Sequence, residues 1–243
     1  MNIPLPHHLW EGDQGIELSL PDEWRTTVLP MAGDEKGLLC PDECRSALKN
    51  LDPYLRDKRE VCVLFDDISR PTRTYAVVPY LLEVFERCRI RDEQVRFICA
   101  LGTHSPLDNK ALRMKLGPEV LERFPVFNHN PYENCESLGK TTRGTPVIVN
   151  REFLSCDGRI GISAFTPHMF CGFGGGSKIL MPGISHADAI KYHHGILLGE
   201  HREQVYGLGR HMGNPLLEDL RESARMAGLG AKIDLLVNSR AEA

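Results

Sequence analysis

The sequence predicts an α/β fold in which a mostly parallel sheet is flanked by helices, and three observations support this. Two apolar runs, at residues 60–65 and 95–101, are typical of strands buried on both faces, as in a parallel sheet. The segment between them, 74–87, has the apolar period of a helix. Further strand and helix patterns alternate as far as residue 237, which is typical of parallel α/β sheets. We therefore expect one Rossmann-like domain over residues 1–243.

The first fifty residues are less regular. Residues 1–9 are polar or proline-rich and are expected to form a loose lead-in. The alternation at 16–20 predicts a strand, with 26–29 as its candidate partner. Residues 41–51 predict a helix, because a proline in the first turn is followed by two acidic residues that favour the positive end of the helix dipole.

The later part of the chain alternates more clearly. Each strand is predicted from a short apolar run, and each helix from a longer apolar period. The remaining predictions are helices at 107–115, 118–124, 187–198 and 216–227, and strands at 146–149, 158–163 and 232–237.

Composition limits the classes of function. The chain has 243 residues and a formal net charge of -4, with no basic cluster, so we expect no nucleic-acid partner. No apolar run is long enough to span a membrane, and no signal peptide is evident at the N-terminus. The eight cysteines are scattered and include no paired zinc motif. We interpret most of them as reduced core residues, which indicates a cytoplasmic protein.

Polar, chemically capable side chains follow three of the predicted strands. Asp67 and Arg70 come after the strand at 60–65, His104 after the strand at 95–101, and His168 after the strand at 158–163. Ligands of open α/β sheets bind at the carboxyl ends of strands, so these residues are expected to converge on one site. Arg70 can pair with a carboxylate or phosphate, and each histidine can exchange a proton near neutral pH. The alternative is a purely local turn at 67–70 and two structural histidines.

The stretch 166–183 combines His168, a run of glycines that ends at Gly176, Lys178 and a closing Pro-Gly pair. Glycine allows backbone N–H groups to approach an anionic ligand closely. The stretch has neither the hydroxyl residue after lysine of a Walker loop nor the glycine spacing of a dinucleotide fingerprint. A partly desolvated lysine here can neutralise a phosphate or act as a covalent anchor. A plain surface loop is the simpler alternative.

His193 and His194 are adjacent in a predicted helix, where neighbouring side chains point about 100° apart. One of the two imidazoles can bind a metal, whereas a solvated pair is the alternative. His186, His201 and His211 are interpreted as surface residues.

Considered together, these residues make the chain similar to the amino-terminal domain of the nickel-dependent lactate racemase and broader 2-hydroxyacid racemase family. The resemblance rests on four segments in the family's order, and the spacing from His168 to Lys178 and on to His194 follows the family pattern. The segments are Asp67-Ile68-Ser69-Arg70-Pro71, Gly102-Thr103-His104, the stretch from Pro167 to Gly183, and His194-Gly195.

The resemblance implies a racemase or epimerase of a small 2-hydroxy acid that works by proton-coupled hydride transfer. The family's cofactor is a nickel-pincer nucleotide, Ni(II)-pyridinium-3,5-bisthiocarboxylic acid mononucleotide. By resemblance, Lys178 is its covalent anchor, His194 is the protein ligand to nickel, and His104 and His168 are the two acid/base groups. The resemblance also implies that Asp67, Ile68, Ser69 and Arg70 line the cofactor, with Arg70 near the substrate carboxylate.

The chain departs from the family pattern in three ways. Ser69 stands where the family often has threonine, and the loop around Gly175 is richer in glycine than usual. Family members also have two domains, and the second is absent from these 243 residues. We therefore expect a C-terminal domain or a second subunit as partner, because an open site favours weak turnover or none.

Two other classes of function are compatible with the same residues. One is a non-catalytic domain that binds an anionic mononucleotide or sugar acid in the glycine loop and uses only the charge of Lys178. The other is a metal hydrolase with His104, His168 and His194 as ligands. A covalent adduct on Lys178 distinguishes the racemase from both.

Overall fold

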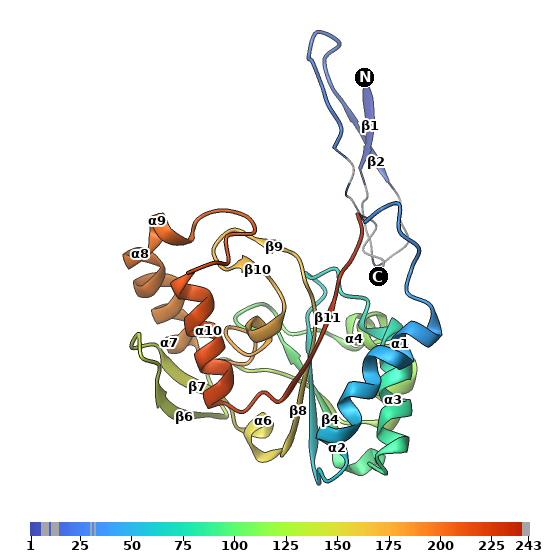
Figure 1. Ribbon diagram of the computed structural model, residues 1–243, viewed down its shortest axis with the longest axis vertical. Coiled ribbons are helices and arrows are strands. Elements are labelled where there is room, and N and C mark those ends of the chain that lie inside the picture. Colours follow the sequence, from blue (N-terminus) through green and yellow to red (C-terminus); the bar gives the residue numbers. More distant parts are fainter. Residues whose placement is uncertain (6–9, 11–14, 30, 32, 240–243) are drawn as a thin grey trace.

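The computed structural model describes residues 1–5, 10, 15–29, 31 and 33–239, and it confirms the predicted α/β fold (Figure 1). Five strands form a central sheet in the order β11-β8-β3-β4-β5. Every neighbouring pair in this sheet is parallel. The strands are β3 (Val61–Asp66), β4 (Val95–Ala100), β5 (Val126–Asn128), β8 (Gly158–Ala164) and β11 (Ala231–Leu235).

The central strand β3 explains why its sequence is apolar without alternation. All six of its residues are buried. Val61, Val63 and Phe65 enter the core on one face of the sheet, whereas Cys62 and Leu64 enter the core on the other face. A strand covered on both sides needs apolar residues at every position.

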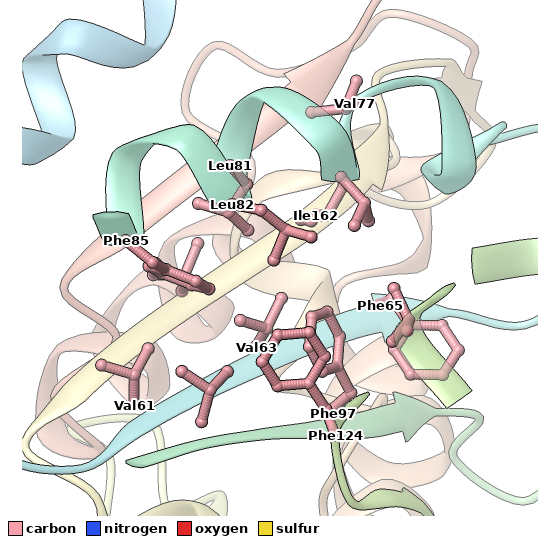
Figure 2. Packing of buried hydrophobic residues seen from close by; sticks show 14 of the residues in the cluster. Val61, Val63, Phe65, Val77, Leu81, Leu82, Phe85, Phe97, Phe124 and Ile162 are labelled. Carbon is pink, nitrogen blue, oxygen red and sulfur yellow. The ribbon is translucent and has the colours of Figure 1, made fainter. Parts of the chain in front are cut away.

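The first core lies between the sheet and the helices of the first half of the chain. Figure 2 shows Leu81, Leu82 and Phe85 of α3 packed toward Val61 and Val63 of β3. Helix α3 starts with a proline at its second residue, a position where a missing N–H costs little. The helices that contribute to this core are α1 (Pro41–Leu48), α2 (Asp52–Leu55), α3 (Val78–Arg87), α4 (Asn109–Leu116) and α5 (Pro118–Arg123).

The second core lies on the opposite face and is built from the second half of the chain. An antiparallel hairpin, β6 (Cys135–Lys140) and β7 (Pro146–Asn150), packs there together with several helices. These are α6 (Arg151–Ser155), α7 (Ala187–Lys191), a π-helical turn (Tyr192–Leu197), α8 (Leu198–Glu200), α9 (Arg202–Val205) and α10 (Pro215–Met226).

The prediction for the N-terminus was wrong in part. Strand β1 (Asn2–Leu5) lies in the expected lead-in and pairs antiparallel with β2 (Ile16–Ser19), whereas residues 26–29 form no strand. Residues 6–9 lie outside the described residues. The two strands form a ribbon that projects from the body of the molecule (Figure 1). The sequence signal of β1 was weak, because Pro4 cannot donate a backbone hydrogen bond to a ladder.

The other predicted elements are found within a few residues of their expected bounds. Sequence reasoning missed β5, β6, α6, α9 and the two-residue strands β9 (Pro167–His168) and β10 (Gly172–Phe173). These elements are too short or too exposed to show a period in the sequence.

All eight cysteines lie in the described part and are free, and five of them are buried. Within that part, no helix combines the length and the hydropathy that crossing a membrane requires.

One close backbone approach links two loops at the carboxyl edge of the sheet. A Cβ at position 183 would overlap the carbonyl oxygen of Ile179 and lie 2.9 Å from Cβ of Ala100. We expect Gly183→Ala to lower the free energy of unfolding by about 1–3 kcal/mol, because the backbone must shift. Urea denaturation measures this. The matched control is Gly199→Ala, where a Cβ meets nothing within 4 Å, and an equal loss in both variants would contradict the steric argument.

His129 provides a pH-dependent contribution to stability. It is buried, with Nε2 3.1 Å from the carbonyl of Ser185, and burial lowers its pKa to about 4. Between that value and the unfolded pKa of about 6.5, the unfolded chain binds more protons, so stability falls as pH drops. When the pH drops from about 6.5 to 4.5, we expect the free energy of unfolding of His129→Gln to fall by about 2 kcal/mol less than that of the wild type. Urea denaturation at each pH measures this. Parallel losses in both proteins would contradict this.

Candidate functional site

A cavity of ≈ 270 Å³ lies at the carboxyl ends of β3, β4 and β8. The loops that follow these strands form its wall, together with the glycine loop and the π-helical turn. The predicted site residues that line it are Asp67, Arg70, His104, His168, Lys178 and His194. Ile68 and Ser69 do not line this cavity, and they border a neighbouring pocket that also includes His104. The convergence expected from the strand ends is therefore present.

Asp67 and His104 form a carboxylate–histidine pair at the rim. Nδ1 of His104 lies 2.6 Å from Oδ2 of Asp67, and Oδ1 of Asp67 accepts a hydrogen bond of 2.7 Å from the backbone N–H of Ser69. Burial acts to raise the pKa of Asp67, but the hydrogen bonds from Ser69 and His104 outweigh it and lower the pKa. The ionised carboxylate holds the imidazole proton on Nδ1. Nε2 of the neutral ring is then unprotonated and able to accept a proton.

A buried lysine fixes the loop that carries Asp67 and Arg70. The side chain of Lys115 on α4 is fully buried and lies 2.6 Å from Oδ1 of Asp66. The same ammonium donates to the backbone carbonyls of Asp67 at 3.0 Å and Arg70 at 3.3 Å. Oδ2 of Asp66 accepts from the hydroxyl of Thr72 at 2.5 Å. The ammonium of Lys115 thus holds both ends of the turn at 67–70. The alternative of a purely local turn does not include this contact with α4.

Trp10 covers this lysine from the outside. Its indole N–H donates to the carbonyl of Ile68 at 2.8 Å, and Nζ of Lys115 lies 5.0 Å from the centre of its ring. The loop is therefore held by α4 on one side and by the N-terminal segment on the other.

The glycine loop follows β8 and is shaped by Asp234 on β11. Oδ1 of Asp234 accepts from the backbone N–H of Gly176 at 2.7 Å and from the hydroxyl of Ser163 at 2.8 Å. Gly175 has φ +77°, and a Cβ there would lie 2.8 Å from the carbonyl oxygen of Ala164. Only glycine fits this close crossing of β8.

Lys178 and His168 contact each other inside the cavity. Nζ of Lys178 lies 3.2 Å from Nε2 of His168, whose Nδ1 accepts from the backbone N–H groups of Phe170 and Cys171. Because Nδ1 is an acceptor, the proton of the neutral ring is on Nε2, which then donates to the amine lone pair of Lys178. Burial lowers the pKa of His168 to about 4, and burial also lowers the pKa of Lys178. The geometry therefore favours an uncharged, nucleophilic amine at Lys178.

The two adjacent histidines lie in the π-helical turn, a feature often found at functional sites. His194 lines the cavity, and His193 is fully buried behind it. Their Nδ1 atoms are 3.3 Å apart. Burial lowers the pKa of each ring to about 4. The alternative of a solvated pair is therefore wrong, because the wider turn directs both rings inward.

The arrangement does not support a metal site built from protein groups alone. Among the described residues, no group of three His, Cys, Asp or Glu side chains is placed to hold a metal ion. The three-histidine hydrolase site with His104, His168 and His194 is thus not formed. His194 supplies one imidazole, and Lys178 supplies an amine in the same cavity.

Sequence reasoning missed the residues that support the site. Lys115 could have been noticed, because it falls on the apolar stripe of its helix between Leu112 and Leu116. Nothing in the local sequence marks Asp234 or Trp10, since the Gly176 partner of Asp234 and the Ile68 partner of Trp10 each lie 58 residues away.

The sequence is similar to proteins of one known family. Residues 12–206 match the family model described as the lactate racemase N-terminal domain. A protein named lactate racemase from Thermoanaerobacterium thermosaccharolyticum is 25% identical over 249 aligned residues, which cover 98% of this chain and 57% of that protein. Another from Lactiplantibacillus plantarum is 25% identical over 191 residues, or 77% of this chain and 44% of that protein. The chain thus spans about half the length of the curated relatives it matches.

Solved structures show the same fold. The lactate racemase apoprotein of T. thermosaccharolyticum superposes with a TM-score of 0.81 at 23% identity, over 100% of this chain and 57% of that chain. A protein from Thermotoga maritima superposes with a TM-score of 0.67 at 24% identity, over 82% of this chain and 51% of that chain.

The buried ion pair predicts a large effect on stability. We expect Lys115→Met to lower the free energy of unfolding by about 3–5 kcal/mol, because it leaves the Asp66 carboxylate buried without its cation. Adding Asp66→Asn should recover part of the loss, and Lys36→Ala, at an exposed lysine, should change little. Urea denaturation measures all three variants. Additive losses in the double variant would contradict a direct pairing of the two charges.

Proposed function

The chain belongs to the lactate racemase N-terminal domain family, and from that premise we propose that it is the cofactor-binding part of a racemase or epimerase of a small 2-hydroxy acid. The observation that carries the proposal is the convergence of a buried lysine amine, three histidines and Arg70 on one cavity. A site built only to hold an anion has no need for a lysine whose pKa is lowered by burial.

The cofactor of the proposal is the nickel-pincer nucleotide. Lys178 would hold it covalently and His194 would bind its nickel, while the backbone of the glycine loop and the turn at 67–70 would lie along it. These residues fit the group, because the desolvated amine of Lys178 and the imidazole of His194 share the cavity. When bound, the cofactor supplies an acceptor that takes hydride from the substrate carbon and returns it.

The protein's own part is to bind the substrate and move protons. The side chain of Arg70 makes no hydrogen bond or ion pair with any described residue, so its guanidinium is available to a substrate carboxylate. His104 takes the hydroxyl proton through its unprotonated Nε2, while Asp67 holds the ring in place. His168 can donate its Nε2 proton to the substrate oxygen from the other face of the substrate. It is free to do so once Lys178 is attached to the cofactor and no longer accepts a hydrogen bond from this N–H.

Two further parts of the proposal concern a partner for the domain and its location in the cell. A C-terminal domain or a second subunit would close the cavity over the substrate and exclude water. A cytoplasmic location is proposed from the unpaired, mostly buried cysteines.

The proposal is tested by covalent loading of Lys178. The chain is co-expressed with cofactor-synthesis enzymes in nickel-containing medium, and its intact mass is measured before peptide mapping. We expect an added mass of mononucleotide size on the peptide that contains Lys178. Lys178→Ala should abolish the adduct. Lys232→Ala should retain it, because Lys232 lies beside the same glycine loop without lining the cavity.

The opposite result would favour another class. If the chain stays unmodified under conditions that load a full-length relative, covalent attachment is wrong for this chain. The domain would then be assigned to non-covalent binding of an anionic mononucleotide or sugar acid. Stoichiometric zinc without an organic group would instead support a hydrolase.

A further inference from the structure

The structure contains a buried polar group behind His194 that the proposed function does not use. His193 is fully buried, and so is Asp219 on α10. Nε2 of His193 lies 3.3 Å from the backbone carbonyl of Leu216 and 3.9 Å from Oδ2 of Asp219. Oδ1 of Asp219 accepts a hydrogen bond of 2.5 Å from the hydroxyl of Thr141. A fully buried histidine with this environment is costly unless its polar atoms are paired.

The partners of Nε2 determine where the ring proton of His193 lies. The carbonyl oxygen of Leu216 can only accept a hydrogen bond, so Nε2 must carry the proton. The opposite tautomer would place an unprotonated nitrogen against the lone pairs of this carbonyl inside the core. Nδ1 of His193 is therefore unprotonated and available as an acceptor.

The next ring follows from the first. Nδ1 of His194 lies 3.3 Å from Nδ1 of His193, and the ring centres are 5.0 Å apart. Since Nδ1 of His193 accepts, Nδ1 of His194 must donate. Nε2 of His194 then has no proton.

We propose that His193 is a positioning residue that fixes the ring proton of His194 on Nδ1 and so leaves Nε2 of His194 unprotonated at the cavity. Metal-binding histidines usually donate their other N–H to a carboxylate, a carbonyl or water, and here a second histidine takes that place. The proposal deepens the proposed function, in which Nε2 of His194 is the nickel ligand. The tautomer itself exists in the chain without cofactor and is measured there.

The test is long-range ¹H–¹⁵N spectroscopy of the chain labelled with ¹⁵N-histidine at neutral pH, without cofactor or metal. We expect the proton of His193 on Nε2 and the proton of His194 on Nδ1. The second result is informative because a free imidazole side chain favours the proton on Nε2. A wild-type His194 with its proton on Nε2 overturns the proposal.

Variants separate positioning from a merely structural role. His193→Phe keeps an aromatic ring but removes the acceptor, so the proton of His194 should move toward Nε2. His193→Asn should retain the wild-type tautomer of His194, because its amide oxygen can replace Nδ1 as acceptor. His201→Phe removes a histidine that does not line the cavity and should leave the signals of His194 unchanged.

Two outcomes of the variants are decisive. If His194 keeps its proton on Nδ1 in folded His193→Phe, the carbonyl of Ile190, another hydrogen-bond partner of His194, fixes the tautomer and the proposal is wrong. If His193→Phe does not fold, the wild-type tautomers and His193→Asn decide. A chain that shows the expected tautomers but forms no adduct on Lys178 supports this inference while contradicting the proposed function.

Discussion

The ion pair between Lys115 and Asp66 is the interaction on which the candidate site depends. Asp66 ends the central strand, and the backbone after it must leave the sheet and turn back toward the cavity. Lys115 reaches this point from α4 and binds the carboxylate together with two carbonyls of the turn. The ammonium group of Lys115 therefore has all of these partners inside the protein. Lys115 holds Asp67 and Arg70 in place through their backbone carbonyls, which leaves both side chains free to face the cavity.

The cavity is basic in composition, yet burial keeps much of it uncharged. His168, His194 and Lys178 all have lowered pKa values, and desolvation is the largest cause in each case. Nearby positive charge adds to it, from Lys178 for the two histidines and from Arg70 for Lys178. Neutral imidazoles and a neutral amine are the forms that bind metals and attack electrophiles. The guanidinium of Arg70 also lines the cavity and supplies a positive charge there. An anionic substrate would thus meet one fixed positive charge among neutral groups.

The sequence predicted those parts of the fold and site that depend on local pattern. Strands β3, β4 and β8 were evident from apolar runs, and the rule that ligands bind at strand ends placed Asp67, His104 and His168 together. What it could not predict depends on contacts between distant segments. Lys115, Asp234 and Asp219 act through partners that only the folded chain brings near. The π-helical turn was missed for a similar reason, since its sequence reads as an ordinary helix.

His104 and His168 differ in what they offer to the cavity. His104 offers the lone pair of Nε2, whereas His168 offers an Nε2–H donor. For the proposed racemisation, thermodynamics limits what this asymmetry can do. Mirror-image substrates have equal free energies, so the Haldane relation requires kcat/KM to be the same in both directions. The difference between the two histidines can only alter how that ratio divides between kcat and KM for each enantiomer. An asymmetric site and a symmetric reaction are therefore compatible, with the asymmetry confined to saturation behaviour.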